Sequence, residues 1–128
     1  PQENPLEVAA VDDSACLSAI APGLVHPGLR LINTIYSSGA GFLEVLDAHC
    51  SKAVALHELA RLLDIPIAQT MAIGDNLNDL ELLAGAGIGV AMGNARPEVQ
   101  AVARYITGSN AEDGVAMAIE RHVLGERR

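Results

Sequence analysis

Aromatic residues are scarce in this chain of 128 residues. It has no tryptophan, one phenylalanine and two tyrosines, although half of its residues are hydrophobic. A core large enough for about one domain must therefore be built from Ala, Val, Leu and Ile, as in sheets that are covered by helices. The high apolar content argues against a disordered chain.

Cysteines and long apolar runs are also few. Cys16 and Cys50 are the only cysteines, too few for a disulfide framework, so we expect free thiols in a reducing compartment. No apolar run approaches the roughly 20 residues that span a bilayer. The N-terminal sequence PQENPLEV has no basic start typical of a secretion signal. We therefore expect a soluble, cytoplasmic protein.

Basic residues are the minority among the charged side chains. Eight Lys and Arg stand against sixteen Asp and Glu, which gives a net charge of -8. This charge repels nucleic-acid phosphates and anionic membrane surfaces, so we expect neither as a partner. A small phosphorylated substrate is compatible with it, because a divalent cation bound to carboxylates reverses the local field.

Helical and extended patterns alternate from residue 51 onward. The stretch 51–64 has apolar residues at helical spacing and begins with Ser51, a suitable N-cap. Further strands are expected at 70–73, 87–92 and 104–107, and further helices at 79–86, 96–103 and 111–124. Asn94 and Asn110 are the expected N-caps of the last two helices. This alternation predicts an α/β fold with a parallel sheet and flanking helices.

The first third of the chain has a different pattern. Pro, Gly and Ser interrupt shorter apolar runs, and residues 31–46 are typical of two strands joined by a tight turn. We therefore expect a first unit at 1–42, a second at 43–124 and a tail at 125–128, with the boundary within 39–49.

Acids and amides cluster after the first strand of the second unit, in the stretch TMAIGDNLNDLELL. In parallel α/β sheets ligands bind beyond the carboxyl ends of the strands, where Asp75 would lie. Asn78 and Asp79, at the start of the next helix, can face the same site, and carboxylate oxygens suit Mg²⁺. Leu77 in the third loop position argues against an EF-hand. By spacing alone, a capped turn is as good an interpretation as a metal site.

Four blocks of sequence, in this order along the chain, carry a family resemblance: SKAVALHELARLLDI, GDNLNDLELL, AGAGIGVAMGNA and YITGSNAEDGVAMAIE. Together they resemble the C-terminal part of the Cof-type phosphatases of the haloacid dehalogenase superfamily, over roughly residues 30–124. The resemblance implies a Rossmann-like core, of which 43–124 would be the C-terminal half. Residues 1–42 would then be the remnant of an α/β cap.

The resemblance also implies a reaction and roles for four residues. Family members hydrolyse small phosphate esters with Mg²⁺ through a covalent aspartyl-phosphate. Lys52 matches the lysine that contacts the phosphoryl group and the nucleophilic carboxylate. Asp75 matches the Mg²⁺ ligand, Asn78 the amide that holds the phosphate, and Asp79 the acid that supports the metal site. Ala53 departs from the glycine that the family usually has after this lysine.

The family's nucleophile motif, Asp-x-Asp-Gly-Thr, is absent from these 128 residues. Asp12 and Asp13 are adjacent, so successive strand positions would direct them to opposite faces, and we expect a loop or helix start there. The chain alone is therefore expected not to hydrolyse phosphate esters.

Two other functions remain as alternatives. One is a noncatalytic module that binds Mg²⁺ or phosphate, or that associates with a second copy or a complementary chain. The other is a fragment of the phosphorylation domain of a cation-pumping ATPase, which the lack of apolar spans and the block SNAEDGVAMAIE disfavour. The four histidines have no metal-ligand spacing. Met71, Met92 and Met117 occupy apolar positions and are expected in the core.

Overall fold

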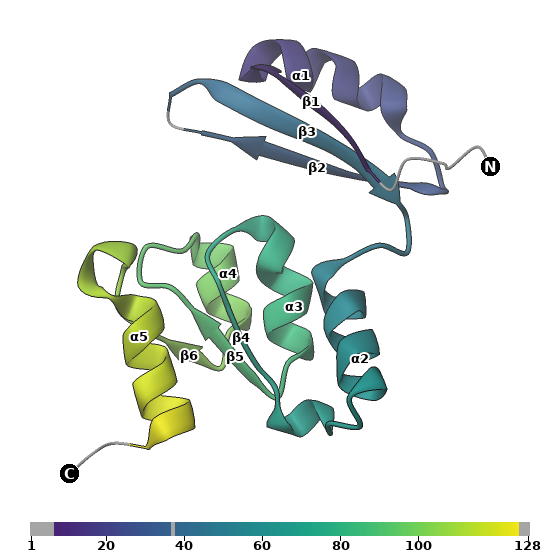
Figure 1. The fold of residues 1–128 in the computed structure, drawn as a ribbon. Helices are drawn as coiled ribbons and strands as arrows, with labels where there is room; N and C mark the ends of the chain where they lie inside the picture. Colours follow the sequence, from purple (N-terminus) through teal and green to yellow (C-terminus); the bar gives the residue numbers. More distant parts are fainter. Residues whose placement is uncertain (1–6, 37, 126–128) are drawn as a thin grey trace. The chain divides into compact units, whose positions relative to one another are not determined.

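The computed structural model describes residues 7–36 and 38–125. The chain forms two compact units, Pro1–Cys50 and Ser51–Arg128, whose elements are shown in Figure 1. The boundary falls later than the predicted division between 42 and 43, because residues 40–47 form a strand of the first unit. Apart from Gly125, the expected tail at 125–128 lies outside the described residues.

The first unit is a three-stranded antiparallel sheet with one helix. Its elements are β1 (Glu7–Asp13), α1 (Ser14–Ile20), the 3-10 turn η1 (Ala21–Leu24), β2 (Leu29–Ile35) and β3 (Ala40–Asp47), in the sheet order β1-β3-β2. Strands β2 and β3 form the hairpin expected at 31–46. Leu17 of α1 and Leu43 of β3 are buried and form the centre of this unit.

Asp12 and Asp13 lie at the end of β1. The Asp13 side chain accepts a hydrogen bond from the backbone N–H of Ala15 at 2.8 Å and so caps α1. Asp12 accepts one from the N–H of Asp13 at 2.7 Å. Asp13 therefore stands at a helix start, as expected.

The second unit is a parallel α/β structure. Its elements are α2 (Lys52–Leu62), η2 (Ile67–Gln69), β4 (Met71–Gly74), η3 (Leu77–Asp79), α3 (Leu80–Gly85), β5 (Ile88–Ala91), α4 (Pro97–Val102), β6 (Tyr105–Ile106), η4 (Asn110–Glu112), α5 (Gly114–Ile119) and the π turn η5 (Glu120–Leu124). The sheet has the order β4-β5-β6, and both strand pairs are parallel. The predicted α/β class with a parallel sheet is confirmed.

Aliphatic side chains make the core of the second unit. The buried cluster consists of Ala72, Leu83, Ala91, Met92, Ala95 and Val99. Of the three methionines expected in the core, Met92 is buried and Met71 is half-buried. The prediction for Met117 is wrong, because this residue is 50% exposed on α5.

Ser51 caps α2 as predicted, by accepting a hydrogen bond from the N–H of Val54 at 3.2 Å. The prediction of Asn94 and Asn110 as N-caps is wrong. Asn110 lies inside η4, whose N-cap is Ser109, and the N-cap of α5 is Asp113. The N-cap of α4 is Arg96, and the Asn94 side chain instead accepts from the backbone N–H of Asn110 at 2.8 Å. Asn94 thus satisfies a donor distant in sequence, which local spacing cannot reveal.

Two further features agree with the sequence. Cys16 and Cys50 are both free and exposed. In the described part of the chain, no helix combines the length and the apolar character needed to cross a membrane.

A substitution of Leu83 tests whether this residue belongs to the core of the second unit. Leu83 is 2% exposed, so we expect Leu83→Ala to lower the free energy of unfolding by about 2–5 kcal/mol, through lost burial and the remaining cavity. Amide hydrogen exchange of β5, measured by NMR, reports on this unit alone. Leu62→Ala is the matched control, because Leu62 is 70% exposed, and it should change stability by less than about 0.5 kcal/mol. Equal effects of the two substitutions would contradict this core assignment.

Candidate active site

The connection from β4 to α3 is organised around one carboxylate, that of Asp79. Asp79 is 5% exposed and is the only buried charged residue among those that the structure describes. One of its oxygens, Oδ2, accepts hydrogen bonds from the backbone N–H groups of Asp75 at 3.1 Å and Asn76 at 3.2 Å. The Asn76 side chain in turn accepts from the N–H of Leu77 at 2.8 Å. The reciprocal bonds between Asn76 and Asp79 form a capping box that fixes the loop at the carboxyl end of β4.

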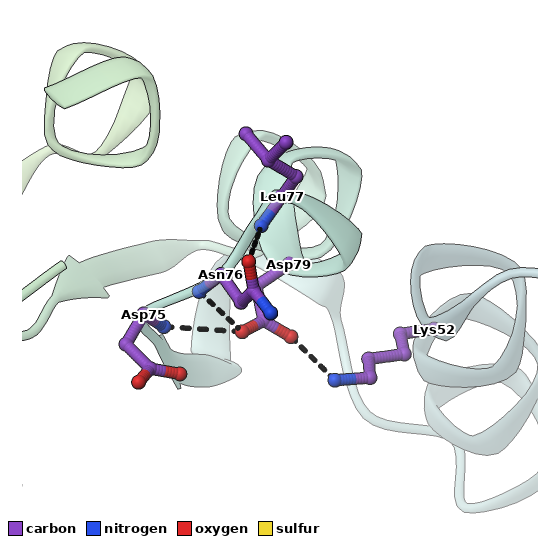
Figure 2. A network of polar contacts seen from close by, with 5 residues as sticks. All are labelled: Lys52, Asp75, Asn76, Leu77 and Asp79. Atoms are coloured by element: carbon purple, nitrogen blue, oxygen red, sulfur yellow. Dashed lines mark hydrogen bonds and ion pairs between the residues drawn. The ribbon is translucent and has the colours of Figure 1, made fainter. Parts of the chain in front are cut away.

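Lys52 supplies the countercharge for this buried carboxylate. Its Nζ donates to Oδ1 of Asp79 at 2.5 Å, as Figure 2 shows. Lys52 is the first residue of α2, and α2 packs against α3 and η3, so the two side chains meet although they are 27 positions apart. The Lys52 side chain remains 50% exposed, whereas that of Asp79 is 7% exposed. The Asp79 side of the ion pair is therefore buried, and the Lys52 side is open to solvent.

The protonation of Asp79 follows from these contacts. Burial raises the pKa of its carboxyl, but the Lys52 hydrogen bond and the N–H groups of Asn76 and Asp75 lower it more. The net pKa lies below the ordinary value for aspartate. Asp79 is thus a fixed negative charge at neutral pH, and it holds the Lys52 ammonium in place.

Asp75 and Asn78 flank this pair. The Asp75 carboxylate is exposed, and Figure 2 draws it free of the contacts that hold Asp79. The backbone oxygen of Asp75 accepts from the N–H of Arg96 at 3.2 Å, which fixes the residue's main chain. Asn78 lies half-buried in η3. The structure thus places all four predicted site residues in the second unit and directly joins Lys52 to Asp79.

These residues fit Mg²⁺ as one side of a site. The exposed Asp75 carboxylate offers the hard oxygen ligand that Mg²⁺ prefers. Both oxygens of Asp79 already accept hydrogen bonds from N–H donors, so Asp79 is suited to position its neighbours. Within residues 7–36 and 38–125, no group of three or more His, Cys, Asp or Glu side chains could hold a metal. The remaining ligands must come from water, substrate or other protein groups.

Reasoning from the sequence missed two parts of this site. The sequence predicted that the Lys52 amine converges with Asp75 and Asp79 on one site, but not that Lys52 pairs directly with Asp79. It also left a capped turn open, but did not identify Asn76 as the cap. The spacing of Asn76 and Asp79 could have indicated the cap, since a capping residue followed three positions later by an acid is a recognised helix start. No local signal could have indicated the Lys52 contact, because it depends on how α2 packs.

The sequence of this chain is similar to those of known hydrolases. A family model described as haloacid dehalogenase-like hydrolase matches residues 2–119. The phosphatase YwpJ of Bacillus subtilis is 44% identical over 91 residues, which are 71% of this chain and 32% of YwpJ. The 5-amino-6-(5-phospho-D-ribitylamino)uracil phosphatase YcsE of Bacillus subtilis is 44% identical over 90 residues, 70% of this chain and 36% of YcsE.

A solved structure supports the same assignment of fold. The crystal structure of a haloacid dehalogenase-like hydrolase from Bacteroides thetaiotaomicron superposes with a TM-score of 0.77 and 36% sequence identity. The match covers 93% of this chain and 45% of that protein. The chain thus spans about a third of the length of the curated relatives it matches and less than half of the solved one.

The lowered pKa of Asp79 implies that the stability of the second unit depends on pH. A depressed folded-state pKa contributes stability that is present above the unfolded pKa of about 4, and that is lost as pH falls through the lower folded value. We expect Asp79→Asn to destabilise the second unit at pH 7 by about 1–3 kcal/mol, because it removes the charge that Lys52 pairs with. The difference from the unsubstituted chain should shrink below about pH 4. Amide hydrogen exchange across this pH range measures both effects.

Glu112→Gln is the matched control for Asp79→Asn. Glu112 also has a lowered pKa, from its hydrogen bonds with Ser109, but it is exposed. We expect a smaller loss of stability there, because water replaces the lost interaction. A difference between Asp79→Asn and the unsubstituted chain that stayed constant down to about pH 3 would contradict the role given to Asp79.

A substitution of Gly74 tests how tightly the loop after β4 packs against Asp79. A Cβ atom at position 74 would lie 2.5 Å from Cβ of Asp79 and 2.8 Å from its Oδ2. Gly74→Ala must therefore displace a carboxylate held by three donors, and we expect a loss of about 1–3 kcal/mol in the free energy of unfolding. The amide proton shifts of Asp75 and Asn76, observed by NMR, should change as their hydrogen bonds lengthen.

Gly85→Ala is the control for Gly74→Ala. Its added Cβ would lie 3.3 Å from Nε2 of the exposed His57 side chain, which can move aside. We expect no loss of stability and unchanged amide shifts at Asp75 and Asn76. If the two alanine variants behave alike, close packing at position 74 is not what fixes the loop.

Proposed function

Because this chain belongs to the haloacid dehalogenase-like hydrolase family, we propose that it supplies part of the active site of a Mg²⁺-dependent phosphomonoesterase. The observation that carries the proposal is the buried Asp79 carboxylate, which holds the half-exposed Lys52 ammonium and accepts from the backbone N–H of Asp75, whose side chain is exposed. A fixed cation near a carboxylate that suits Mg²⁺ is a combination that phosphoryl transfer requires.

The charge of each side chain determines its role in the proposed reaction. Hydrolysis of a phosphomonoester needs positive charge on the phosphoryl oxygens and little covalent assistance beyond a nucleophile. Asp79 uses one of the three N–H donors of Lys52, so the others can bind a phosphoryl oxygen. Asp75 would hold Mg²⁺, and bound Mg²⁺ supplies further positive charge to the phosphate. Asn78, in the adjacent turn, offers an amide to the phosphate.

The nucleophile is the part that these 128 residues lack. No Asp-x-Asp-Gly-Thr sequence is present. Asp13 is occupied as the cap of α1, and Asp12 precedes it on an antiparallel strand rather than at the end of a parallel one. We therefore propose that the isolated chain does not hydrolyse phosphate esters, and that the activity belongs to an assembled core.

The substrate class proposed is a small phosphorylated metabolite. One relative, YcsE, is named for a phosphorylated ribitylaminouracil, which is a phosphomonoester of moderate size. An acidic chain with a net charge of -8 favours such a ligand, bound through a cation, over nucleic acid.

A hybrid enzyme tests the proposal. The 91-residue segment of YwpJ that matches this chain is replaced by the matching segment of this chain, and hydrolysis of p-nitrophenyl phosphate is measured with and without Mg²⁺. We expect Mg²⁺-dependent hydrolysis. Asp75→Asn and Lys52→Met should each lower kcat/KM by about 100-fold or more, because each removes charge stabilisation of the transferring group.

Asp64→Asn is the matched control for Asp75→Asn. Asp64 is an exposed acid beyond the end of α2 with a positive φ of 53°, a conformation that asparagine tolerates. We expect unchanged kcat/KM there. The isolated chain should show no hydrolysis, and robust Mg²⁺-dependent hydrolysis by it that Asp75→Ala abolishes would refute the need for an external nucleophile.

A further inference from the structure

A basic residue that the proposed reaction does not use, Arg96, lies directly beside Asp75. The backbone N–H of Arg96 donates to the carbonyl oxygen of Asp75 at 3.2 Å. Arg96 is the N-cap residue of α4, but its side chain makes no capping hydrogen bond. The residue is exposed at the edge of the sheet where β4 and β5 end. The main chain of Arg96 is therefore tied to the candidate Mg²⁺ ligand, while its side chain takes no part in holding the turn.

The loop that carries Arg96 is fixed by hydrogen bonds. The Gln100 side chain donates through Nε2 to the carbonyl oxygens of Gly93 at 3.1 Å and Ala95 at 3.2 Å. The N–H of Gly93 donates in turn to the carbonyl oxygen of Gly108 at 3.0 Å. Position 96 thus has a set main-chain conformation, which lowers the entropy that a ligand contact from this side chain costs.

Lys52 and Arg96 lie on two sides of the loop of Asp75. Helix α3 packs against both α2 and α4, and Figure 1 shows α3 between them. A series of three hydrogen bonds joins the two basic residues, from Lys52 to Asp79, from Asp79 to the N–H of Asp75, and from the carbonyl oxygen of Asp75 to Arg96. The candidate Mg²⁺ ligand is therefore flanked by two cations, one on α2 and one at the start of α4.

The other arginines that the structure describes in the second unit belong to the opposite edge of the sheet. Arg61 is in the last turn of α2 and pairs with Glu58 at 2.9 Å. Arg104 directly precedes β6, and Arg121 lies in η5, after α5. Helices that connect parallel strands run back toward the amino ends of the strands, so these three side chains are remote from the loop after β4.

We propose that Arg96 selects the substrate by binding a carboxylate that the phosphomonoester has in addition to its phosphoryl group. The inference rests on the proposed function, in which Lys52 and a Mg²⁺ held by Asp75 bind the phosphoryl group. Arginine has parallel N–H donors that match the two oxygens of a carboxylate. A phosphorylated organic acid satisfies both cations, whereas the corresponding alcohol leaves the guanidinium without an anion. The substrate class is therefore a small phosphorylated acid.

A contact of Arg96 with the phosphoryl group itself fits less well. In the proposed function that group already meets Lys52, Asn78 and bound Mg²⁺. Arg96 bonds to the carbonyl oxygen of Asp75, whereas the Lys52–Asp79 pair is connected to its N–H. A cation on the phosphoryl group would affect every phosphomonoester alike, and a cation on a second group discriminates among them. The two roles therefore differ in a measurable way.

Matched substrate pairs test the proposal in the YwpJ hybrid, built to include position 96. 3-Phosphoglycerate is compared with glycerol 3-phosphate, and 6-phosphogluconate with sorbitol 6-phosphate. In each pair a carboxylate replaces a hydroxymethyl group and nothing else changes. We expect a higher kcat/KM for the acid in at least one pair. Arg96→Met should lower the acid-to-alcohol ratio by about 10-fold or more, mainly through KM, because a charged hydrogen bond is lost.

Arg96→Lys and Arg61→Met are the control variants. Arg96→Lys keeps the charge but loses the fork of donors, so it should retain part of the preference for acids. Arg61→Met removes an exposed arginine at the other end of α2 and should leave the ratio unchanged. Both positions are exposed, so the substitutions leave the chain folded.

Binding to this chain alone provides a second measurement, which does not need activity. The chain is titrated with the same four compounds in the presence of Mg²⁺, and the Nε–H signal of Arg96 is followed by NMR. We expect the acid of at least one pair to bind about 10-fold or more tightly than its alcohol and to shift this signal. Arg96→Met should abolish the difference in affinity.

The outcomes separate this proposal from the proposed function. A preference for acids in the titration that depends on Arg96, without hydrolysis by the hybrid, supports the role of Arg96 and counts against the function. Mg²⁺-dependent hydrolysis with the same acid-to-alcohol ratio in Arg96→Met and the unsubstituted hybrid overturns the role and leaves the function standing. Equal losses for acids and alcohols would place Arg96 on the phosphoryl group and overturn the proposal. No preference for acids in either measurement overturns it as well.

Discussion

The site depends on the interactions of one buried carboxylate, that of Asp79. It is expensive to bury a charge without compensation, and here a lysine and two backbone N–H groups provide it. Each compensating bond also has a structural result. The backbone bonds shape the loop at the end of β4, and the ion pair ties α2 to η3. One side chain thus sets the conformation that displays Asp75 and directs Lys52.

The same arrangement underlies the proposed binding of a phosphate ester by an acidic protein. The net charge is -8, yet the buried anion Asp79, the half-exposed cation Lys52 and the exposed acid Asp75 belong to one local group. The hydrogen bonds that Asp79 accepts stabilise its negative charge, and its ion pair with Lys52 orients the Lys52 side chain. Asp75 is left available for a hard cation. The chemistry is decided by this short-range order and not by the overall charge.

The second unit is a folded three-stranded parallel sheet with flanking helices. Its core cluster lies around β4, β5, α3 and α4, while one side of α2 and one edge of β4 have no partner within the described residues. Lys52, which pairs with Asp79, is the first residue of the same helix α2.

Periodicity and local chemistry were enough to determine the parallel α/β pattern, the hairpin at 31–46 and the Ser51 cap, because each depends on neighbours within a few residues. The motif around Asp75 was found in the same way, through its position after a strand. The bond from Lys52 to Asp79, the use of Asn94 as a tertiary acceptor and the boundary after Cys50 were decided only by the tertiary structure. Each of these joins segments far apart in the chain, and packing alone determines which of them meet.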